Sequence, residues 1–311
     1  DEARAAMAEI MAGRATPAQI GGYLMALKVK GETAEEILGS VEALRAAARP
    51  FPLPGHDLLD TCGTGGDGKG TFNVSTTVAF VLAGAGVKVA KHGNRSVSSA
   101  SGSADLLEAL GIRVEVEPDD AARLVEDLGL CFLYAPPYHP AMKHAFGPRR
   151  ELGVRTLFNI VGPLANPART GRQIVGVFRP DLVGLFAEVL RGLGLVRGFV
   201  FHGEAGLDEL TTVGPAILAE VTAAGSTIRR VDPADYGLPR ARLEDLRGGT
   251  AAENARTTLA ILGGERGPRR DTVLFAAAHG LVAAGRTPTI EEGLAGAARS
   301  IDSGEASGVL Q

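Results

Sequence analysis

Two segments rich in glycine and hydroxyl side chains hold most of the residues in this chain that could do chemistry. Residues 60–77 read DTCGTGGDGKGTFNVSTT, and residues 91–99 read KHGNRSVSS. Each segment follows a strand-like apolar run and precedes a helix-like run, so backbone N–H groups, hydroxyls and helix N-termini would converge there. Such loops typically bind a multiply charged anion, and we therefore expect a phosphorylated substrate.

One standard phosphate motif almost fits the first segment. Gly63, Gly68 and Lys69 match the nucleoside-triphosphate loop, but Gly70 stands where that motif has the Ser or Thr that binds magnesium. Asp67 would also repel a triphosphate. A plain tight turn is the other alternative, but it does not explain why a second phosphate-type loop follows within one strand–helix unit.

Length and composition allow one large domain, or a large and a small one. The 311 residues are 45% hydrophobic, which is enough for a substantial core. The formal charge of -4 gives no overall basic field toward nucleic acid or anionic lipid. Cys62 and Cys131 cannot form a disulfide framework and suit a reducing compartment. We see no signal peptide and no apolar run long enough for a bilayer, so we expect a cytoplasmic protein that binds neither nucleic acid nor membrane.

Residues 1–50 read as helices. Thr16 followed by Pro17, and Thr33 followed by Glu36, are patterns typical of helix starts. Three prolines between residues 50 and 54 then end the helical stretch.

From residue 58 onward, short apolar strands alternate with helices. We expect strands at 87–90, 114–116, 131–134, 174–178 and 198–201, and helices at 75–83, 103–110, 119–128 and 182–193. This alternation predicts a mainly parallel sheet covered by helices on both faces, with ligands at the carboxyl ends of the strands. Both glycine-rich segments fall at such ends. Helices return from residue 252, with breaks at 263–264 and 285.

Short motifs spread along the chain form a consistent set. They are GTGGD at 63–67, NVST at 73–76, KHGNR at 91–95, GSADLLEALG at 102–111, HPAM at 139–142, RRELGVRT at 149–156, FN at 158–159, GPLANP at 162–167 and GLDEL at 206–210. Together they resemble the signature motifs of the anthranilate phosphoribosyltransferase family, in the family's order. The family usually has a further helix ahead of Asp1, so we expect a trimmed amino terminus.

The resemblance implies an α/β fold of two domains, as in nucleoside phosphorylases. Residues 1–54, joined by a helical segment near 138–160, would form a small all-helical domain. Residues 55–311 would form the larger domain, with a mainly parallel sheet flanked by helices. Members are commonly homodimers, so a homodimer is expected.

The resemblance also implies a reaction in tryptophan biosynthesis. The phosphoribosyl group of 5-phosphoribosyl 1-pyrophosphate (PRPP) would pass to the amine of anthranilate, giving N-(5-phosphoribosyl)anthranilate and pyrophosphate. Positive charge grows on the sugar and negative charge on the leaving group, so the site needs preorganised donors, metal ions and a positioned acceptor. The implied cofactor is Mg2+, as two ions, and the implied partners are the two small-molecule substrates.

By this resemblance, both glycine-rich segments bind PRPP. The implied contacts are Gly63, Gly66, Asp67, Thr71, Asn73, Val74, Ser75, Thr76, Lys91, His92, Gly93, Asn94, Arg95, Ser96, Val97, Ser98, Ser99 and Ser103. A helix start at residues 73–76 would add free amides and the positive end of a helix dipole. The plain alternative is an ordinary capped helix beside a solvated lysine. Ala100 stands where many relatives have a lysine, so weaker pyrophosphate binding is expected.

The implied metal ligands are Ser75, Asp208 and Glu209. Two adjacent acids usually mark only a solvated loop, because magnesium sites use few protein carboxylates together with substrate phosphates. Their place within the GLDEL motif favours the metal site over that alternative. Asp67 could assist through water or ribose hydroxyls.

The implied anthranilate contacts are Gly63, Asn94 and Arg149, with Asn94 and Arg149 as positioning residues and no residue assigned as acid or base. A bidentate guanidinium suits a planar carboxylate. Arg150 and Arg155 are expected to face solvent or to be structural. The family more often has Pro-Val before this arginine, whereas this chain has Gly147-Pro148.

A strong general base is not required, because an arylamine is already neutral. His92, His139 and His144 are the candidates for a proton acceptor, although lone histidines are more often structural. Cys62 has no paired His or Asp pattern, and we expect a small buried residue rather than a nucleophile.

Three rival functions stay open. A pyrimidine nucleoside phosphorylase would share the layout and the phosphate loop, but it gives no reason for Arg149 or for the acids at 208–209. A type I phosphoribosyltransferase would carry paired acids directly before Thr-Gly-Gly, and here only Asp60-Thr-Cys precedes it. A non-catalytic relative that binds nucleic acid should have a basic, aromatic surface, and the acidic balance with no tryptophan argues against it.

Overall fold

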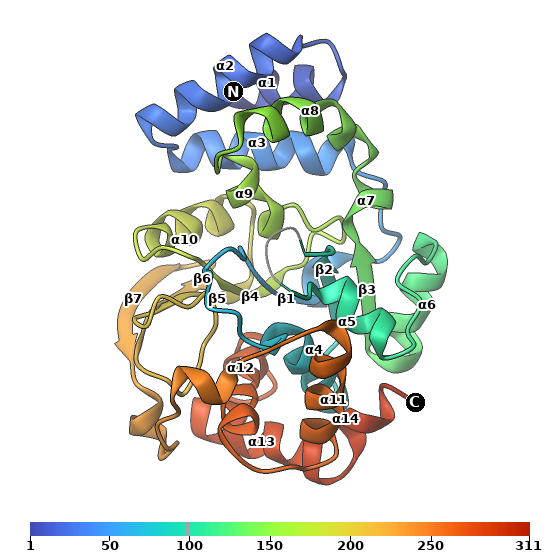
Figure 1. The fold of residues 1–311 in the computed structure, drawn as a ribbon, viewed down its shortest axis with the longest axis vertical. Coiled ribbons are helices and arrows are strands. Elements are labelled where there is room, and N and C mark those ends of the chain that lie inside the picture. Colours follow the sequence, from blue (N-terminus) through green and yellow to red (C-terminus); the bar gives the residue numbers. More distant parts are fainter. Residues whose placement is uncertain (97–99) are drawn as a thin grey trace.

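A bundle of helices occupies one end of the molecule in the computed structural model, which describes residues 1–96 and 100–311 (Figure 1). Three of its helices come from the amino terminus and two from the middle of the chain. They are α1 (Glu2–Met11), α2 (Pro17–Lys30), α3 (Ala34–Ala47), α8 (Lys143–Leu152) and α9 (Phe158–Val161). α8 packs on α1 and α2, and α9 packs on α3. The bundle is thus completed by a segment distant from the amino terminus in sequence.

The predicted helix starts at Thr16 and Thr33 are confirmed. Each threonine hydroxyl accepts a hydrogen bond from the backbone N–H three residues later, at Gln19 and Glu36, over 3.3 Å in both cases. The side-chain oxygens of those two residues in turn accept a hydrogen bond from the threonine N–H. These reciprocal caps satisfy donors that a helix start leaves free, which fixes where α2 and α3 begin.

A seven-stranded sheet forms the second part of the molecule, in the order β3-β2-β1-β4-β5-β6-β7. The strands are β1 (Leu59–Gly63), β2 (Val89–Gly93), β3 (Leu130–Tyr134), β4 (Arg172–Gly176), β5 (Arg197–Gly203), β6 (Ala216–Thr222) and β7 (Gly225–Val231). β1 to β5 are parallel, and β6 and β7 add an antiparallel hairpin to the edge. The predicted small helical domain and mainly parallel sheet are therefore correct.

Four of the five predicted strands are confirmed within a few residues, and the strand at 114–116 is wrong. Val114 is buried and Glu115 is exposed, so the alternation that indicated a strand is real. This segment nevertheless pairs with no strand of the described residues, and it leads into the next helix. Alternating burial does not by itself supply the ladder of hydrogen bonds that defines a strand.

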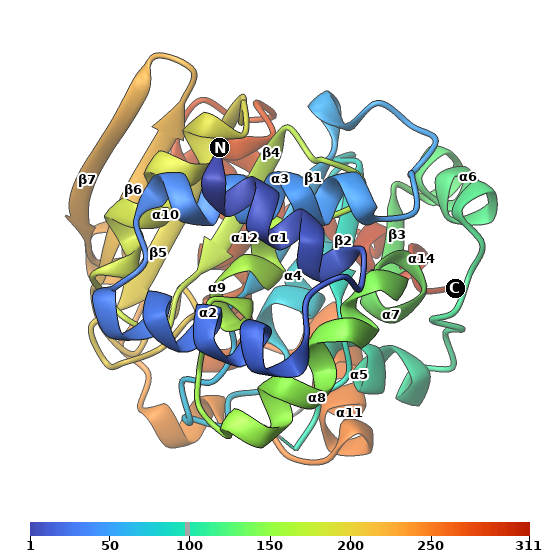
Figure 2. The same ribbon diagram turned by 90° about the horizontal axis from the view of Figure 1, so that it is seen from above.

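Helices cover both faces of the sheet (Figures 1 and 2). The remaining helices are α4 (Val74–Gly84), α5 (Ser103–Ala109), α6 (Pro118–Leu128), α7 (Ala135–Tyr138), α10 (Leu182–Gly192), α11 (Ala251–Leu262), α12 (Pro268–Ala283), α13 (Ile290–Asp302) and α14 (Glu305–Gly308). The four interior helices expected between the strands and the helical return near the carboxyl terminus are confirmed. No helix of the described residues is both long and apolar enough to cross a membrane.

Each face of the sheet has its own apolar core, because successive strand side chains point to opposite faces. Ile174 and Phe199 pack with α4, α12 and α13, whereas Val175 and Val200 pack with α10 and with the helical bundle. The bundle core and this second sheet face are one continuous cluster. The helices at the end of the molecule are therefore anchored to the sheet.

The strand order reverses beside β1, which pairs with β2 on one side and with β4 on the other. The chain runs from β1 to β2 and β3, and then returns to β4 across β1. In open α/β sheets, ligands bind at the carboxyl ends of strands where such a reversal leaves a crevice. Both glycine-rich segments emerge at these ends.

Candidate active site

The first glycine loop, residues 64–73, connects the end of β1 to α4. Its glycines at 65, 66, 68 and 70 all have positive φ angles, between 66° and 77°, which other residues rarely adopt. Asn73 is the N-cap residue of α4, so the loop ends at the positive pole of an 11-residue helix. The second glycine loop, residues 94–102, of which 94–96 and 100–102 are described, lies between β2 and α5.

Two carboxylates reach the first glycine loop from the loop that follows β5. Asp208 Oδ2 accepts a hydrogen bond from the backbone N–H of Gly65 over 2.6 Å. Glu209 Oε1 accepts one from the backbone N–H of Ser75, in the first turn of α4, over 3.3 Å. A Cβ atom at Gly63 would lie 2.6 Å from Asp208 Oδ2, so only glycine allows this approach. The predicted metal ligands 75, 208 and 209 are thus brought together.

Asp67 adds a third carboxylate to this group. Its Oδ1 accepts the N–H of Lys69 over 3.0 Å, whereas its buried Oδ2 has no hydrogen-bond partner among the described residues. Burial and the charge of Asp67 raise the pKa of Asp208, and burial and the charge of Asp208 raise the pKa of Glu209. Asp208 and Glu209 are therefore harder to ionise in the protein alone.

Lys91, at the centre of β2, places its ammonium beside the same group. It donates hydrogen bonds to the carbonyl oxygen of Thr61 and, over 3.3 Å, to the hydroxyl of Ser75. Burial lowers the pKa of Lys91, and the nearby Asp60 and Glu209 carboxylates oppose that shift. The residue is 3% exposed, so it is buried and is not the solvated lysine of the alternative interpretation.

This donor set fits a divalent ion only together with a ligand that brings its own oxygens. Among residues 1–96 and 100–311, no group of three or more His, Cys, Asp or Glu side chains is arranged to hold a metal. The site nevertheless offers hard carboxylate oxygens, one of them buried without a donor, next to a serine hydroxyl. Mg2+ is typically held in this way, by one or two carboxylates and substrate phosphates.

The remaining predicted residues of the first loop have backbone or packing positions. Thr71 pairs with Arg247 in an isolated antiparallel bridge, and the side chain of Asn73 bonds to the carbonyl of Ser101 over 3.1 Å. Val74 and Thr76 are buried in the first turn of α4. Asn73 therefore joins the two glycine loops directly.

The second loop is held by Asp105, which the sequence analysis did not assign. Its Oδ2 accepts the backbone N–H groups of Ser96 (3.0 Å) and Gly102 (2.8 Å). Asn94 presents its carbonyl to the hydroxyl of Ser103 over 3.2 Å. Asp105 is the third residue of α5, a position where a capping acid is common, and that local signal could have found it.

The side chain of Arg95, which was expected to contact PRPP, is instead paired with acidic residues of α5. Its guanidinium bonds to Glu108 over 2.5 and 2.6 Å, and it lies 3.4 Å from Asp105. Two carboxylates of α5 thus neutralise this arginine. Gly93 ends β2, where its neighbour in the sheet is Tyr134. Val97, Ser98 and Ser99 lie outside the described residues.

Arg149 lies in the last turn of α8, and Gly147-Pro148 does not interrupt that helix. Its guanidinium is 4.9 Å from the centroid of the Phe158 ring, a cation–π contact across to α9. It forms no hydrogen bond or ion pair with the described residues, and burial lowers its pKa. A half-buried guanidinium held by an aromatic ring is available for a carboxylate ligand.

His92 and His139 pack edge to face, with their ring centroids 5.2 Å apart. Burial lowers the pKa of both rings, to about 4 for His139. Both Nε2 atoms are buried without a hydrogen-bond partner in the described part of the chain. These rings are therefore neutral near pH 7. Cys62 and Cys131 are buried free thiols with raised pKa values, as expected of packing residues.

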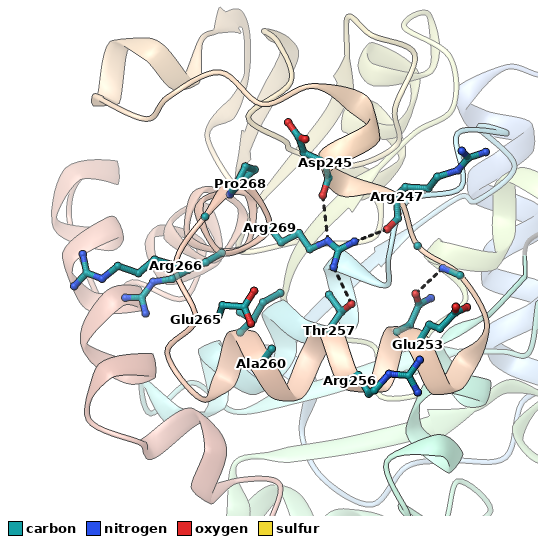
Figure 3. Close-up of a pocket in the computed structure, with 16 residues that line it drawn as sticks. Asp245, Arg247, Glu253, Arg256, Thr257, Ala260, Glu265, Arg266, Pro268 and Arg269 are labelled. Carbon is teal, nitrogen blue, oxygen red and sulfur yellow. Dashed lines mark hydrogen bonds between the residues drawn. The ribbon is translucent and has the colours of Figure 1, made fainter.

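A cavity of about 640 Å³ lies behind the first glycine loop, between α11 and the start of α12 (Figure 3). Arg269 crosses it and donates to the carbonyls of Asp245 (3.1 Å) and Arg247 (2.9 Å) and to the hydroxyl of Thr257 (3.1 Å). The cavity wall also reaches the site, because Asn254 Nδ2 donates to Asn73 Oδ1 over 2.8 Å. None of these supporting contacts was predicted from the sequence.

Comparison with known proteins agrees with this geometry. Residues 1–48 match the helical bundle domain of the glycosyl transferase family, and residues 55–307 match its a/b domain. The chain is 54% identical over 310 residues to anthranilate phosphoribosyltransferase of Moorella thermoacetica, covering 100% of this chain and 91% of the relative.

Solved structures agree as well. The crystal structure of anthranilate phosphoribosyltransferase from Thermus thermophilus matches with a TM-score of 0.94 and 47% identity, over 99% of this chain and 92% of that one. The Saccharomyces cerevisiae enzyme in complex with PRPP and Mg matches with a TM-score of 0.85 and 31% identity, over 94% of this chain and 83% of that one. These identities extend over almost the whole chain, and the chain belongs to the anthranilate phosphoribosyltransferase family.

Proposed function

We propose that this protein transfers the phosphoribosyl group of PRPP to the amine of anthranilate, releasing pyrophosphate, as a step of tryptophan biosynthesis. One observation carries the proposal. Two glycine loops at the switch point of a parallel sheet meet a serine, a buried lysine and a group of carboxylates. This arrangement suits a doubly phosphorylated sugar that binds with a divalent ion.

PRPP would lie across the two loops. Backbone amides of Gly63, Gly66 and the start of α4 would bind its phosphate oxygens, together with Lys91. The other proposed contacts are Asp67, Thr71, Asn73, Val74, Ser75, Thr76, His92, Gly93, Asn94, Ser96, Val97, Ser98, Ser99 and Ser103. Arg95 stays in the proposal only through its backbone, because its guanidinium is paired with α5.

Ser75, Asp208 and Glu209 would hold Mg2+, and we propose two ions. When bound, the ions neutralise charge that develops on the leaving pyrophosphate. The protein's own contribution is to keep three carboxylates close together at a cost in stability, so that the site binds a cation strongly. The pairing of Glu209 with the start of α4 keeps the ligands in register with the loop.

Anthranilate would bind between α8 and the carboxyl ends of β1 and β2. Arg149 would pair with its carboxylate, while Asn94 and Gly63 would border both substrates. The pKa values of His92 and His139 are lowered, so both rings would line this pocket as neutral, weakly basic groups. They are therefore poorly suited to accept a proton from the amine. No acid or base is therefore assigned.

We also propose the domain boundary, the oligomeric state and the cellular location of this protein. The chain divides after residue 54 into the helical domain, completed by 138–160, and the α/β domain at 55–311. It forms a homodimer, as is common in the family. It works in the cytoplasm, which the buried free thiols of Cys62 and Cys131 suit.

The decisive assay follows the loss of anthranilate fluorescence when PRPP is added, with and without Mg2+. We expect consumption only with Mg2+, and a loss of about a hundredfold or more in turnover for Asp208→Asn combined with Glu209→Gln, since metal stabilisation is worth several kcal/mol. Full activity of that variant would contradict the metal assignment. Phosphorolysis of thymidine by the pure protein, without anthranilate consumption, would favour the phosphorylase alternative.

A further inference from the structure

Arg155 connects the segment between α8 and α9 to the first glycine loop. Its Nη2 donates a hydrogen bond to the carbonyl oxygen of Gly66, a residue 89 positions earlier in the sequence. Gly66 precedes Asp67, whose carboxylate belongs to the acidic group of the site. Arg155 is exposed, as expected, and it also touches the loop proposed to bind PRPP.

A second contact fixes the guanidinium of Arg155 in place. Its Cζ lies 4.4 Å from the centroid of the Phe178 ring, in the segment that follows β4. The backbone N–H of Phe178 in turn donates to the hydroxyl of Thr64 over 3.0 Å. Arg155 is therefore joined to both sides of the crevice at which the strand order reverses.

The first glycine loop needs such an outside anchor. Four of its residues are glycines with positive φ, and glycine loses more conformational freedom on ordering than any other residue. Gly66 itself has φ +77°, and a Cβ atom there would lie 3.0 Å from Arg155 Nη2. Its backbone is thus shaped to present the carbonyl at close range to this arginine.

We propose that Arg155 is a positioning residue, which holds the first glycine loop in the form that binds PRPP. The inference deepens the proposed function and rests on it. Arg149, the proposed anthranilate contact, lies in the same chain segment, at the end of α8. One segment therefore supplies the acceptor's carboxylate partner and the anchor of the loop that binds PRPP.

The test compares three variants by steady-state kinetics. For Arg155→Met we expect the KM for PRPP to rise about tenfold, the size of one lost charge-assisted hydrogen bond, with the KM for anthranilate changed less than about twofold. Arg155→Lys keeps a cation that can reach the same carbonyl and ring, and should restore most of the affinity. Arg150→Met removes an exposed neighbouring arginine that forms no hydrogen bond or ion pair with described residues, and should match wild type.

Hydrogen exchange of the substrate-free protein gives a readout that does not depend on activity. The amides of residues 64–68 should exchange faster in Arg155→Met than in wild type or Arg150→Met, at an unchanged urea midpoint. The inference is overturned if PRPP KM and exchange rates equal those of wild type, or if both KM values rise together with a loss of global stability. A wild type that consumes no anthranilate with PRPP would instead contradict the proposed function, and the exchange comparison would still decide whether Arg155 anchors the loop.

Discussion

The buried carboxylates of the candidate site lower the stability of the fold. Burial and neighbouring carboxylates raise the pKa values of Asp208 and Glu209, and the buried Lys91 offsets only part of the shift at Glu209. Such groups typically persist where a cation or substrate relieves the repulsion. The local cost is therefore an indication of function.

Sequence motifs predicted the residues whose signals are local. Gly63, Ser75, Asp208 and Glu209 lie in short recognisable blocks, and the structure brings them together. Arg155 could not be assigned, because its partner Gly66 is 89 residues away and no pattern within its own segment points there.

Anthranilate recognition by Arg149 gives a prediction at this scale. For Arg149→Ala we expect the KM for anthranilate to rise about 10-fold to 100-fold, because a bidentate pair with a charged group contributes about 1.5–3 kcal/mol. The KM for PRPP should change little. Fluorescence kinetics at varied anthranilate measure this, with Arg150→Ala as control, and equal KM values for the two variants would contradict the assignment.

Helices and strands were predictable from the sequence where a run of buried apolar residues also had the length typical of the element. β2, β3, β4, β5 and the helices between them are confirmed, because short, mostly buried apolar runs, such as 131–134 and 198–201, alternate with helical patterns. The hairpin of β6 and β7 gave no such signal, since most of β7 is exposed and carries polar residues such as Arg229 and Arg230. The alternation of apolar and polar residues at 114–116 reflects which side chains are buried, and it does not indicate pairing with another strand.

Arg269 supports the first glycine loop through the elements behind it. It ties the segment at 245–247 to α11 (Figure 3). The backbone N–H of Gly248 donates to the carbonyl of Gly70 in the loop over 2.8 Å. Through these contacts, α12 stabilises the first glycine loop without touching it through Arg269 itself.

For Arg269→Met we expect a loss of about 1–3 kcal/mol in the free energy of unfolding, because three partners lose their donor. Urea denaturation measures this loss. Arg266→Met is the matched control, since Arg266 is exposed and forms no hydrogen bond or ion pair with described residues. Equal stabilities for the two variants would show that the brace contributes nothing.

The whole molecule buries several histidines in neutral form. His279 is fully buried in α12 between Phe199 and Phe275, its Nδ1 donates to the carbonyl of Phe275 over 2.8 Å, and burial lowers its pKa to about 4. In the unfolded chain this pKa is near 6.5, so the unfolded state gains a proton first as the pH falls. Stability from this residue is thus complete above about pH 6.5 and is lost as the pH falls toward about 4.

We expect wild type to lose about 2 kcal/mol more stability than His279→Gln between pH 7.5 and pH 5. The comparison of slopes is needed because Asp60, whose pKa burial raises to about 6, acts in the opposite direction in both proteins. Urea unfolding at a series of pH values gives the two slopes. Parallel slopes would contradict a neutral buried His279.

The central claim is that both glycine loops hold PRPP together with a divalent ion at Ser75, Asp208 and Glu209. Crystals soaked with PRPP and Mn2+, with Mn2+ standing in for Mg2+, test it most directly through the anomalous signal of the metal. We predict density for the sugar across both loops and an anomalous peak beside these three side chains. Empty loops, or a metal peak away from Asp208 and Glu209, would contradict the account.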